Sequence, residues 1–109
     1  MEELDTNETG FVVKRSSEGA SCPIITLGGD LDISSADVFR SLVEEVVSEG
    51  PQRIVFDVRQ LAFMDSSGIA LMVYAANKVN DVELRHASNI VRRVVEATGL
   101  ADVLRLDPA

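Results

Sequence analysis

The residues with the most chemical potential in this sequence lie together, in the segment Phe63-Met64-Asp65-Ser66-Ser67-Gly68-Ile69. A carboxylate and two hydroxyls stand directly before a run of residues with helical character. The first N–H groups of a helix have no partners within the helix, and the helix dipole is positive at that end. A phosphate on Ser66 or Ser67 would therefore lie in a favourable field. It would add about −1.5 to −2 charge to an exposed surface and leave the fold intact.

The same segment also fits an ordinary helix start, because Asp65 is a good N-cap and serine is common in a first turn. Two features favour a functional role. Gly68 stands in the first turn, although glycine in a helix costs about 1 kcal/mol relative to alanine, which suggests close access to the backbone. Residues 69–76 are apolar on every side. Such a helix buries its second face, here expected against the third helix, or exposes it to a partner.

No other group of residues forms a catalytic or metal-binding pattern. His86 is the only histidine and lacks a nucleophile and carboxylate in a matching arrangement. Cys22 is the only cysteine, which excludes an intrachain disulfide and agrees with a reducing compartment. Gly28-Gly29 predicts a turn rather than a phosphate-binding loop. We expect no enzymatic activity, no cofactor and no metal.

The charge and hydropathy of the chain limit the classes of partner that it can bind. Asp and Glu number 18 against 10 Lys and Arg, a formal net charge of −8, which disfavours DNA and RNA. No apolar run is long enough to span a bilayer, and the acidic start lacks the features of a secretory signal. We expect a cytoplasmic protein that binds neither nucleic acid nor membranes. A protein partner with basic patches fits this charge.

The order of elements predicts the α/β class, with residues 1–10 loose and residues 11–109 forming one domain. Two strands precede an alternation of helices and strands, which requires crossovers and hence a partly parallel sheet. We expect a single mixed sheet of four to five strands with about three helices packed against it. The expected strands cover residues 11–15, 22–27, 54–58, 82–84 and 103–106, and the expected helices cover residues 34–50, 66–77 and 88–99.

Three local features of this scheme are specific enough to test. The first two strands should form an antiparallel hairpin whose second strand stops at Gly28-Gly29. Ser34 or Ser35 should cap the first helix, with Asp37 placed as in a capping box. A loop of about six residues should connect the strand at 54–58 to the helix that starts near Ser66, at the sheet edge where α/β proteins usually place ligands.

Four segments of the chain resemble the STAS domain of bacterial anti-sigma factor antagonists. The segment Met64–Ile69, followed by Leu71, is similar to the signature of that family. The other three are Gly29-Asp30-Leu31-Asp32, Ile54-Val55-Phe56-Asp57-Val58 and Ala97-Thr98-Gly99-Leu100, which stand in the family's order. The similarity covers roughly residues 11–106. The chain departs from the family around Asn80-Asp81, where the link is short, which puts the following strand in doubt.

The resemblance implies a partner-switching cycle. The unmodified protein would bind an anti-sigma factor, which is also an ATP-dependent serine kinase, and so release a sigma factor. Phosphorylation of Ser66 would weaken the complex, and a metal-dependent phosphatase of the PP2C class would restore it. In this cycle Gly68 would keep the acceptor accessible, and Asp32 would belong to the same surface or simply stabilise a turn. The partner-binding residues that the resemblance implies are Asp32, Asp65, Ser66, Ser67, Gly68 and Ile69.

Two alternatives remain open from the residues. The chain could be a STAS-like module that binds its partner without phosphorylation, within a transport or stress-signalling complex. It could also be a sensor of a small ligand or nucleotide that uses the same helix N-terminus. Ser67 is not excluded as the acceptor.

Overall fold

The structure of the protein is a computed structural model that describes residues 5–6, 10–17, 19 and 22–106. Within them the chain forms one sheet whose spatial order follows the sequence, β1-β2-β3-β4-β5-β6. The strands are β1 (Asp5–Thr6), β2 (Val12–Ser17), β3 (Pro23–Leu31), β4 (Arg53–Met64), β5 (Asp81–Arg85) and β6 (Arg105–Leu106). The helices are α1 (Ala36–Ser48), α2 (Ser66–Ala76) and α3 (Asn89–Ala97).

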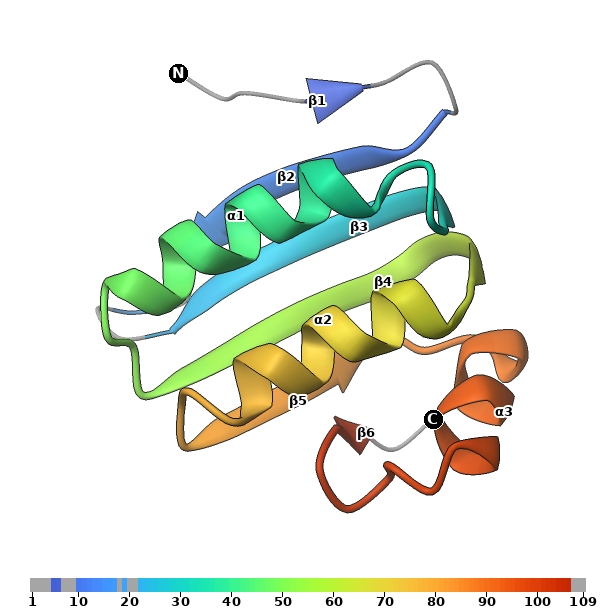
Figure 1. The fold of residues 1–109 in the computed structure, drawn as a ribbon. Helices are drawn as coiled ribbons and strands as arrows, with labels where there is room; N and C mark the ends of the chain where they lie inside the picture. The colour runs from blue at the N-terminus through green and yellow to red at the C-terminus, as the bar shows by residue number, and fades with distance from the viewer. Residues whose placement is uncertain (1–4, 7–9, 18, 20–21, 107–109) are drawn as a thin grey trace.

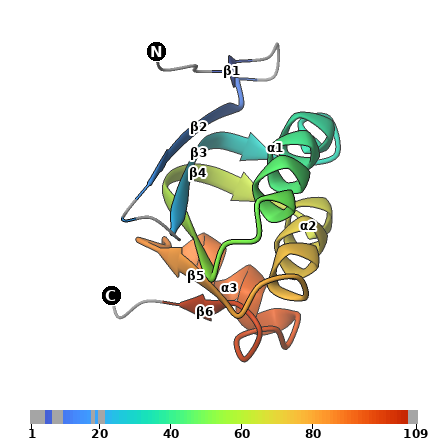
Figure 2. The ribbon, with the colours of Figure 1, turned by 90° about the vertical axis from the view of Figure 1, so that its left-hand side faces the viewer.

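The sheet is mixed, as predicted. Strands β1, β2 and β3 pair antiparallel, whereas β3, β4, β5 and β6 pair parallel to one another. Helices α1 and α2 lie side by side on one face, and α3 lies towards the β5–β6 side (Figures 1 and 2). The extra strand relative to the prediction is β1, part of the segment expected to be loose; residues 1–4 and 7–9 fall outside the described residues. The short link at Asn80 leaves β5 intact and paired with β4.

The core lies between the sheet and the helices α1 and α2. Alternation along β4 directs Ile54, Phe56 and Val58 to this side, where all three are fully buried. Helix α1 contributes an apolar stripe that includes Phe39, whose ring makes an edge-to-face contact with Phe56 at a centroid distance of 5.6 Å. The stripe is the one expected from the helical spacing of the sequence.

Strand β4 is longer than the sequence suggested. In place of a six-residue loop, the strand continues to Met64, and only Asp65 separates it from α2. The polar Arg59-Gln60 pair resembles a loop start, but the chain stays extended because β3 also continues and pairs with it. The predicted hairpin of β2 and β3 is confirmed, whereas the predicted stop of β3 at Gly28-Gly29 is wrong.

Gly29 explains why β3 continues through a pair of glycines. Its φ is +84°, a conformation that favours glycine, and a Cβ there would lie 2.4 Å from the carbonyl oxygen of Gly10. The pairing of β3 with β4 shifts register on either side of Gly28-Gly29. The two glycines therefore form an irregularity inside β3, and the backbone of Gly10 packs closely against it.

A cluster of charged side chains, which the sequence analysis did not anticipate, ties β4, β5 and β6 together. Alternation along β5 directs Glu83 to the face opposite the core, yet this residue is only 6% exposed. Its carboxylate pairs with Arg53 at 2.6 Å, Arg85 at 3.2 Å and Arg105 at 3.2 Å. Arg105 also donates to Asp81 at 2.7 Å. These bonds tie Arg105 of the two-residue strand β6 to β5, in addition to the backbone pairing of the two strands.

This cluster makes stability depend on pH through Asp81. The hydrogen bond from Arg105 lowers the pKa of the Asp81 carboxyl below its ordinary value. A lowered folded-state pKa gives stability that is present above the unfolded-state pKa, about 3.9, and is lost as the pH falls through the folded value. We expect Asp81→Asn to lower the melting temperature at pH 7, by less than the equivalent of about 1 kcal/mol for so exposed a pair.

The same substitution should have a vanishing effect in acid, where Asp81 of the wild type is itself protonated. Thermal unfolding of both proteins from pH 7 to pH 2, followed by circular dichroism, checks this. A difference between the two melting temperatures that stays constant down to the lowest pH would contradict the assignment.

Candidate functional site

The start of α2 is fixed by Asp65. This residue has an extended backbone, and its carboxylate accepts the N–H of Ser67 at 2.8 Å, which is the N-cap role predicted from the sequence. Its own N–H donates to the carbonyl of Leu31 at 3.1 Å, and its carbonyl accepts the N–H of Ile69 at 3.2 Å. Asp65 therefore joins the helix to the end of β3 and sets where the following residues lie.

The two serines of the segment differ in exposure. Ser66 is the first residue of α2 and is exposed, whereas Ser67 is half-buried and its backbone N–H is held by the Asp65 cap. The Ser66 hydroxyl is thus presented at the surface where a helix begins. An enzyme can reach it, and a phosphate there would lie at the positive end of the helix dipole.

Gly68 and Ile69 lie beneath this surface. Both are buried, and a Cβ at position 68 would lie 2.7 Å from Cγ and Cδ2 of Leu31 and 3.0 Å from Cγ of Met64. The glycine therefore allows α2 to pack closely on the ends of β3 and β4. This packing, rather than access from outside, explains the residue type, and a role of either residue in partner binding stays a prediction.

Asp32 lies in the neighbouring connection between β3 and α1. Its carboxylate accepts both the N–H of Ser34 at 3.0 Å and the Ser34 hydroxyl at 2.6 Å, and the hydroxyl bond is the main reason that its pKa lies below the ordinary value. The carboxylate is therefore ionised at neutral pH. The turn role considered for this residue is present, and the residue is half-exposed beside the predicted site.

Ser35 is the N-cap of α1 by position, but its side chain makes no capping bond. The buried hydroxyl accepts the N–H of Asp32 at 3.0 Å and donates to the carbonyl of Asp30 at 2.8 Å. It thus fixes the connection before the helix. The predicted capping box is wrong, because Asp37 pairs with Arg40 at 2.8 Å instead of returning to the cap.

The strand register brings these two connections together. Leu31 pairs with Met64 in the parallel β3–β4 ladder, and each strand then turns into its own helix at the same edge of the sheet. Two carboxylates border this edge, those of Asp32 and Asp65, and both residues are half-buried. The site around Ser66 is thus acidic before any modification, and a phosphate would make it more so.

Sequence reasoning missed the apolar residues that remain in water near this edge. Ile33, in the β3–α1 connection, is 80% exposed, and Phe63, next to last in β4, is 45% exposed. The available signal for Ile33 was an isoleucine placed inside a polar turn, Asp32-Ile33-Ser34. Helix α2, which is apolar on every side, packs on the sheet and alongside α1. The expected packing against the third helix is therefore replaced by packing against the first.

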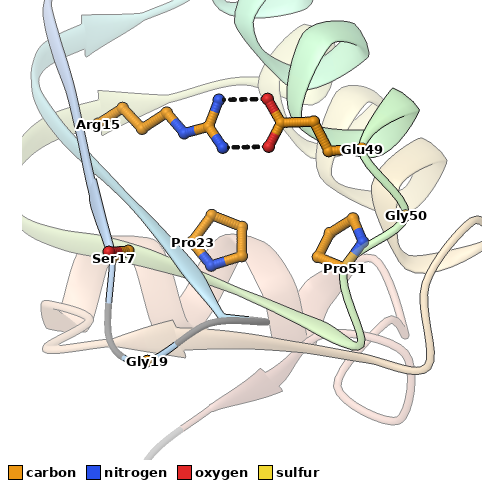
Figure 3. A pocket seen from close by; sticks show the side chains of 7 residues that line it. All are labelled: Arg15, Ser17, Gly19, Pro23, Glu49, Gly50 and Pro51. Carbon is orange, nitrogen blue, oxygen red and sulfur yellow. Dashed lines mark hydrogen bonds and ion pairs between the residues drawn. The ribbon is translucent and has the colours of Figure 1, made fainter.

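A small hollow of about 150 Å³ lies at the opposite end of the sheet, between the β2–β3 hairpin and the α1–β4 connection (Figure 3). Arg15 and Glu49 face each other across it with two hydrogen bonds, and Glu45 adds a weaker ion pair to Arg15. The bond from Arg15 lowers the pKa of Glu49. The two charged side chains of the hollow are thus bonded to each other, and they hold the hairpin against the end of α1.

Residues 12–109 match the sequence profile described as STAS domain. The chain belongs to the STAS domain family. It is 28% identical over 87 residues to the anti-sigma-B factor antagonist of Staphylococcus aureus, a match that covers 76% of this chain and 81% of the relative. The STAS fold of the structure agrees with the sequence-based prediction of a single mixed sheet with three helices.

Solved structures of similar fold carry the same kind of name. An anti-sigma factor antagonist from Mycobacterium paratuberculosis superposes with a TM-score of 0.83 at 18% identity, over 95% of this chain and 91% of that one. The Bacillus cell fate determinant SpoIIAA in its phosphorylated form superposes with a TM-score of 0.69 at 22% identity, over 88% of this chain and 91% of that one. These likenesses establish the fold.

Among the helices that the structure describes, none is long and apolar enough to cross a membrane. In the same part of the chain, His, Cys, Asp and Glu residues do not gather in groups of three or more that could hold a metal ion.

Proposed function

We propose that this STAS domain is an anti-sigma factor antagonist whose docking is switched by phosphorylation of Ser66. The observation that carries the proposal is the exposed Ser66 hydroxyl at the first position of α2, between the Asp65 cap and the Asp32 turn. In the unmodified state the acidic edge binds an anti-sigma factor that is also a serine kinase. Binding frees the sigma factor, and transfer of a phosphate to Ser66 ends the interaction.

The physical basis of the switch is local. The helix N-terminus accommodates the phosphate, so the fold persists in both states. The partner, in contrast, would have to bury a dianion beside the carboxylates of Asp32 and Asp65, and a charge buried without a partner is costly. Affinity therefore falls without any large conformational change in this domain.

The names of similar proteins support this proposal. The S. aureus relative is named an anti-sigma-B factor antagonist, and the M. paratuberculosis structure is that of an anti-sigma factor antagonist. SpoIIAA, which shares the fold, has been solved in a phosphorylated form. By analogy, a metal-dependent phosphatase of the PP2C class would remove the phosphate from Ser66. The cycle would run in the cytoplasm, where ATP and sigma factors meet.

The test is phosphorylation by the source organism's own anti-sigma factors. Each is purified and incubated with ATP, Mg²⁺ and the wild-type protein, and the product is analysed by intact-mass and peptide mass spectrometry. We expect one phosphate on the peptide that contains Ser66, none on Ser66→Ala, and unchanged phosphate incorporation on Ser67→Ala, because Ser67 is half-buried behind the Asp65 cap.

The alternatives predict other outcomes in this assay. Stable binding of an anti-sigma factor or another protein without any phosphate transfer would favour a passive STAS module. Binding of a nucleotide to the isolated domain, detected by calorimetry, would favour a sensor. If Ser66→Ala is still phosphorylated and Ser67→Ala is not, the acceptor is Ser67.

A further inference from the structure

The connection between β3 and α1 exposes an isoleucine on an ordered turn. Ile33 is 80% exposed, more than the other large apolar side chains that the structure describes. A single exposed apolar residue is ordinary on a protein surface. Two observations set Ile33 apart, namely the order of the backbone that carries it and its place at the proposed docking edge.

The backbone on both sides of Ile33 is fixed by hydrogen bonds within the turn. On one side the Asp32 N–H donates to the buried Ser35 hydroxyl at 3.0 Å, and on the other the Ser34 N–H donates to the Asp32 carboxylate at 3.0 Å. The Ser35 N–H closes the turn by donating to the carbonyl of Asp32 at 3.1 Å. The position of the isoleucine is therefore set before any partner arrives, which lowers the entropy cost of burying it in an interface.

The surroundings of Ile33 indicate the chemistry of its partner. Asp32 stands just before it in the chain, and the hydrogen bond from the Asp65 N–H to the carbonyl of Leu31 brings Asp65 to the same edge of the sheet. An apolar side chain at an edge that carries two carboxylates matches an apolar pocket bordered by basic side chains. Interfaces of this kind place an apolar anchor at the centre and complementary charges around it.

We infer that Ile33 is the apolar anchor of the docking surface and inserts into a hydrophobic pocket, rimmed by Lys or Arg, on the anti-sigma factor. The inference rests on the proposed function and adds the residue that supplies affinity, whereas Ser66 supplies the switch. The phosphate on Ser66 then acts at the rim of the interface, where it alters the charge match around an anchor that does not move.

The test measures the dissociation constant for the anti-sigma factor that phosphorylates Ser66 in the assay above, by calorimetry without ATP. Burial of each carbon contributes a roughly constant free energy, so Ile33→Val, which removes one carbon, should raise the constant about fourfold, and Ile33→Ala, which removes three, should raise it about sixtyfold. The melting temperature should stay at the wild-type value in both variants, because the side chain lies in water in the free protein.

The matched control is Ile90→Ala, which truncates another exposed isoleucine (55%) on α3; its dissociation constant should equal that of the wild type. Wild-type affinity in Ile33→Ala, while Ser66→Asp loses binding, would overturn the anchor and leave the proposed function standing. An equal loss in Ile90→Ala would also overturn it. Failure of the wild type to bind any anti-sigma factor would remove the proposed function, and the anchor with it.

Discussion

Ser66→Asp is expected to raise the dissociation constant for the anti-sigma factor at least about thirtyfold, while the domain keeps its fold. A carboxylate that enters an interface without a partner costs about 2 kcal/mol or more, which corresponds to this factor. The cost is high here because Asp32 and Asp65 already make the edge acidic. Calorimetric titration without ATP measures the constant.

The melting temperature of Ser66→Asp should stay within a few degrees of the wild-type value. At the first position of α2 a negative charge interacts favourably with the helix dipole, by about 0.3–1 kcal/mol. Repulsion from the nearby carboxylates opposes this gain, and solvent screens both effects at an exposed residue. The two small contributions have opposite signs, so the free energy of unfolding should change little.

Two controls separate charge from position. Ser66→Asn introduces a side chain with the shape of aspartate but without its charge, and this variant should keep most of the affinity for the partner. Asn89→Asp adds the same charge at the first position of α3, also exposed, and should leave affinity unchanged. Equal losses in Ser66→Asp and Ser66→Asn would show that size decides, and a large drop in melting temperature would show that Ser66 is structural.

The parts of the fold that were predictable are those fixed by local pattern. The stripe that includes Phe39 and Val43 identified α1, because a helix with one apolar face has only one way to bury it. Asp65 identified the start of α2, because its carboxylate satisfies an N–H of the same segment. Both features depend on residues within a few positions of each other.

The features that could not be predicted depend on residues far apart in the chain. The extension of β4 through Arg59-Gln60 is stabilised by its pairing with β3, about thirty positions earlier. Glu83 lies in a strand that was predicted, but the three arginines that converge on it come from β4, β5 and β6. A polar residue in sequence carries no mark of a distant partner.

The candidate site also has some features that could be predicted from neighbouring residues and others that could not. That Ser66 follows the helix cap could be read from the segment itself, but its proximity to Asp32 depends on the register of β3 and β4. The role of Ser35 was misjudged because a serine before a helix usually caps it, whereas this hydroxyl faces back into the turn. The reason for Gly68 was misjudged as well, since only packing reveals what a Cβ would meet.

Gly68→Val should be the most destabilising single change at this site. Leu31 and Met64, whose atoms would lie 2.7 and 3.0 Å from the new Cβ, are 0% and 1% exposed and cannot move into solvent. Overpacking of this kind costs about 1–3 kcal/mol, and the two further methyl groups of valine increase the overlap. Gly68→Ala should cost less, because alanine regains about 1 kcal/mol of helix propensity. Chemical denaturation gives both values.

Ala70→Val is the matched control, because it adds a branched side chain to α2 at an exposed position two residues away, where only a small change in helix propensity is expected. If the close contact with Leu31 is the cause, Gly68→Ala combined with Leu31→Ala should cost less than the sum of the single changes, with a coupling of about 0.5–3 kcal/mol. If the free energies of the two changes are strictly additive, α2 moves away from Leu31 at no cost in stability.

The contact between Gly68 and Leu31 also places Ser66 beside Asp32. Gly68→Ala should therefore weaken partner binding as well, and adding Leu31→Ala should restore part of the affinity because the helix returns to its position.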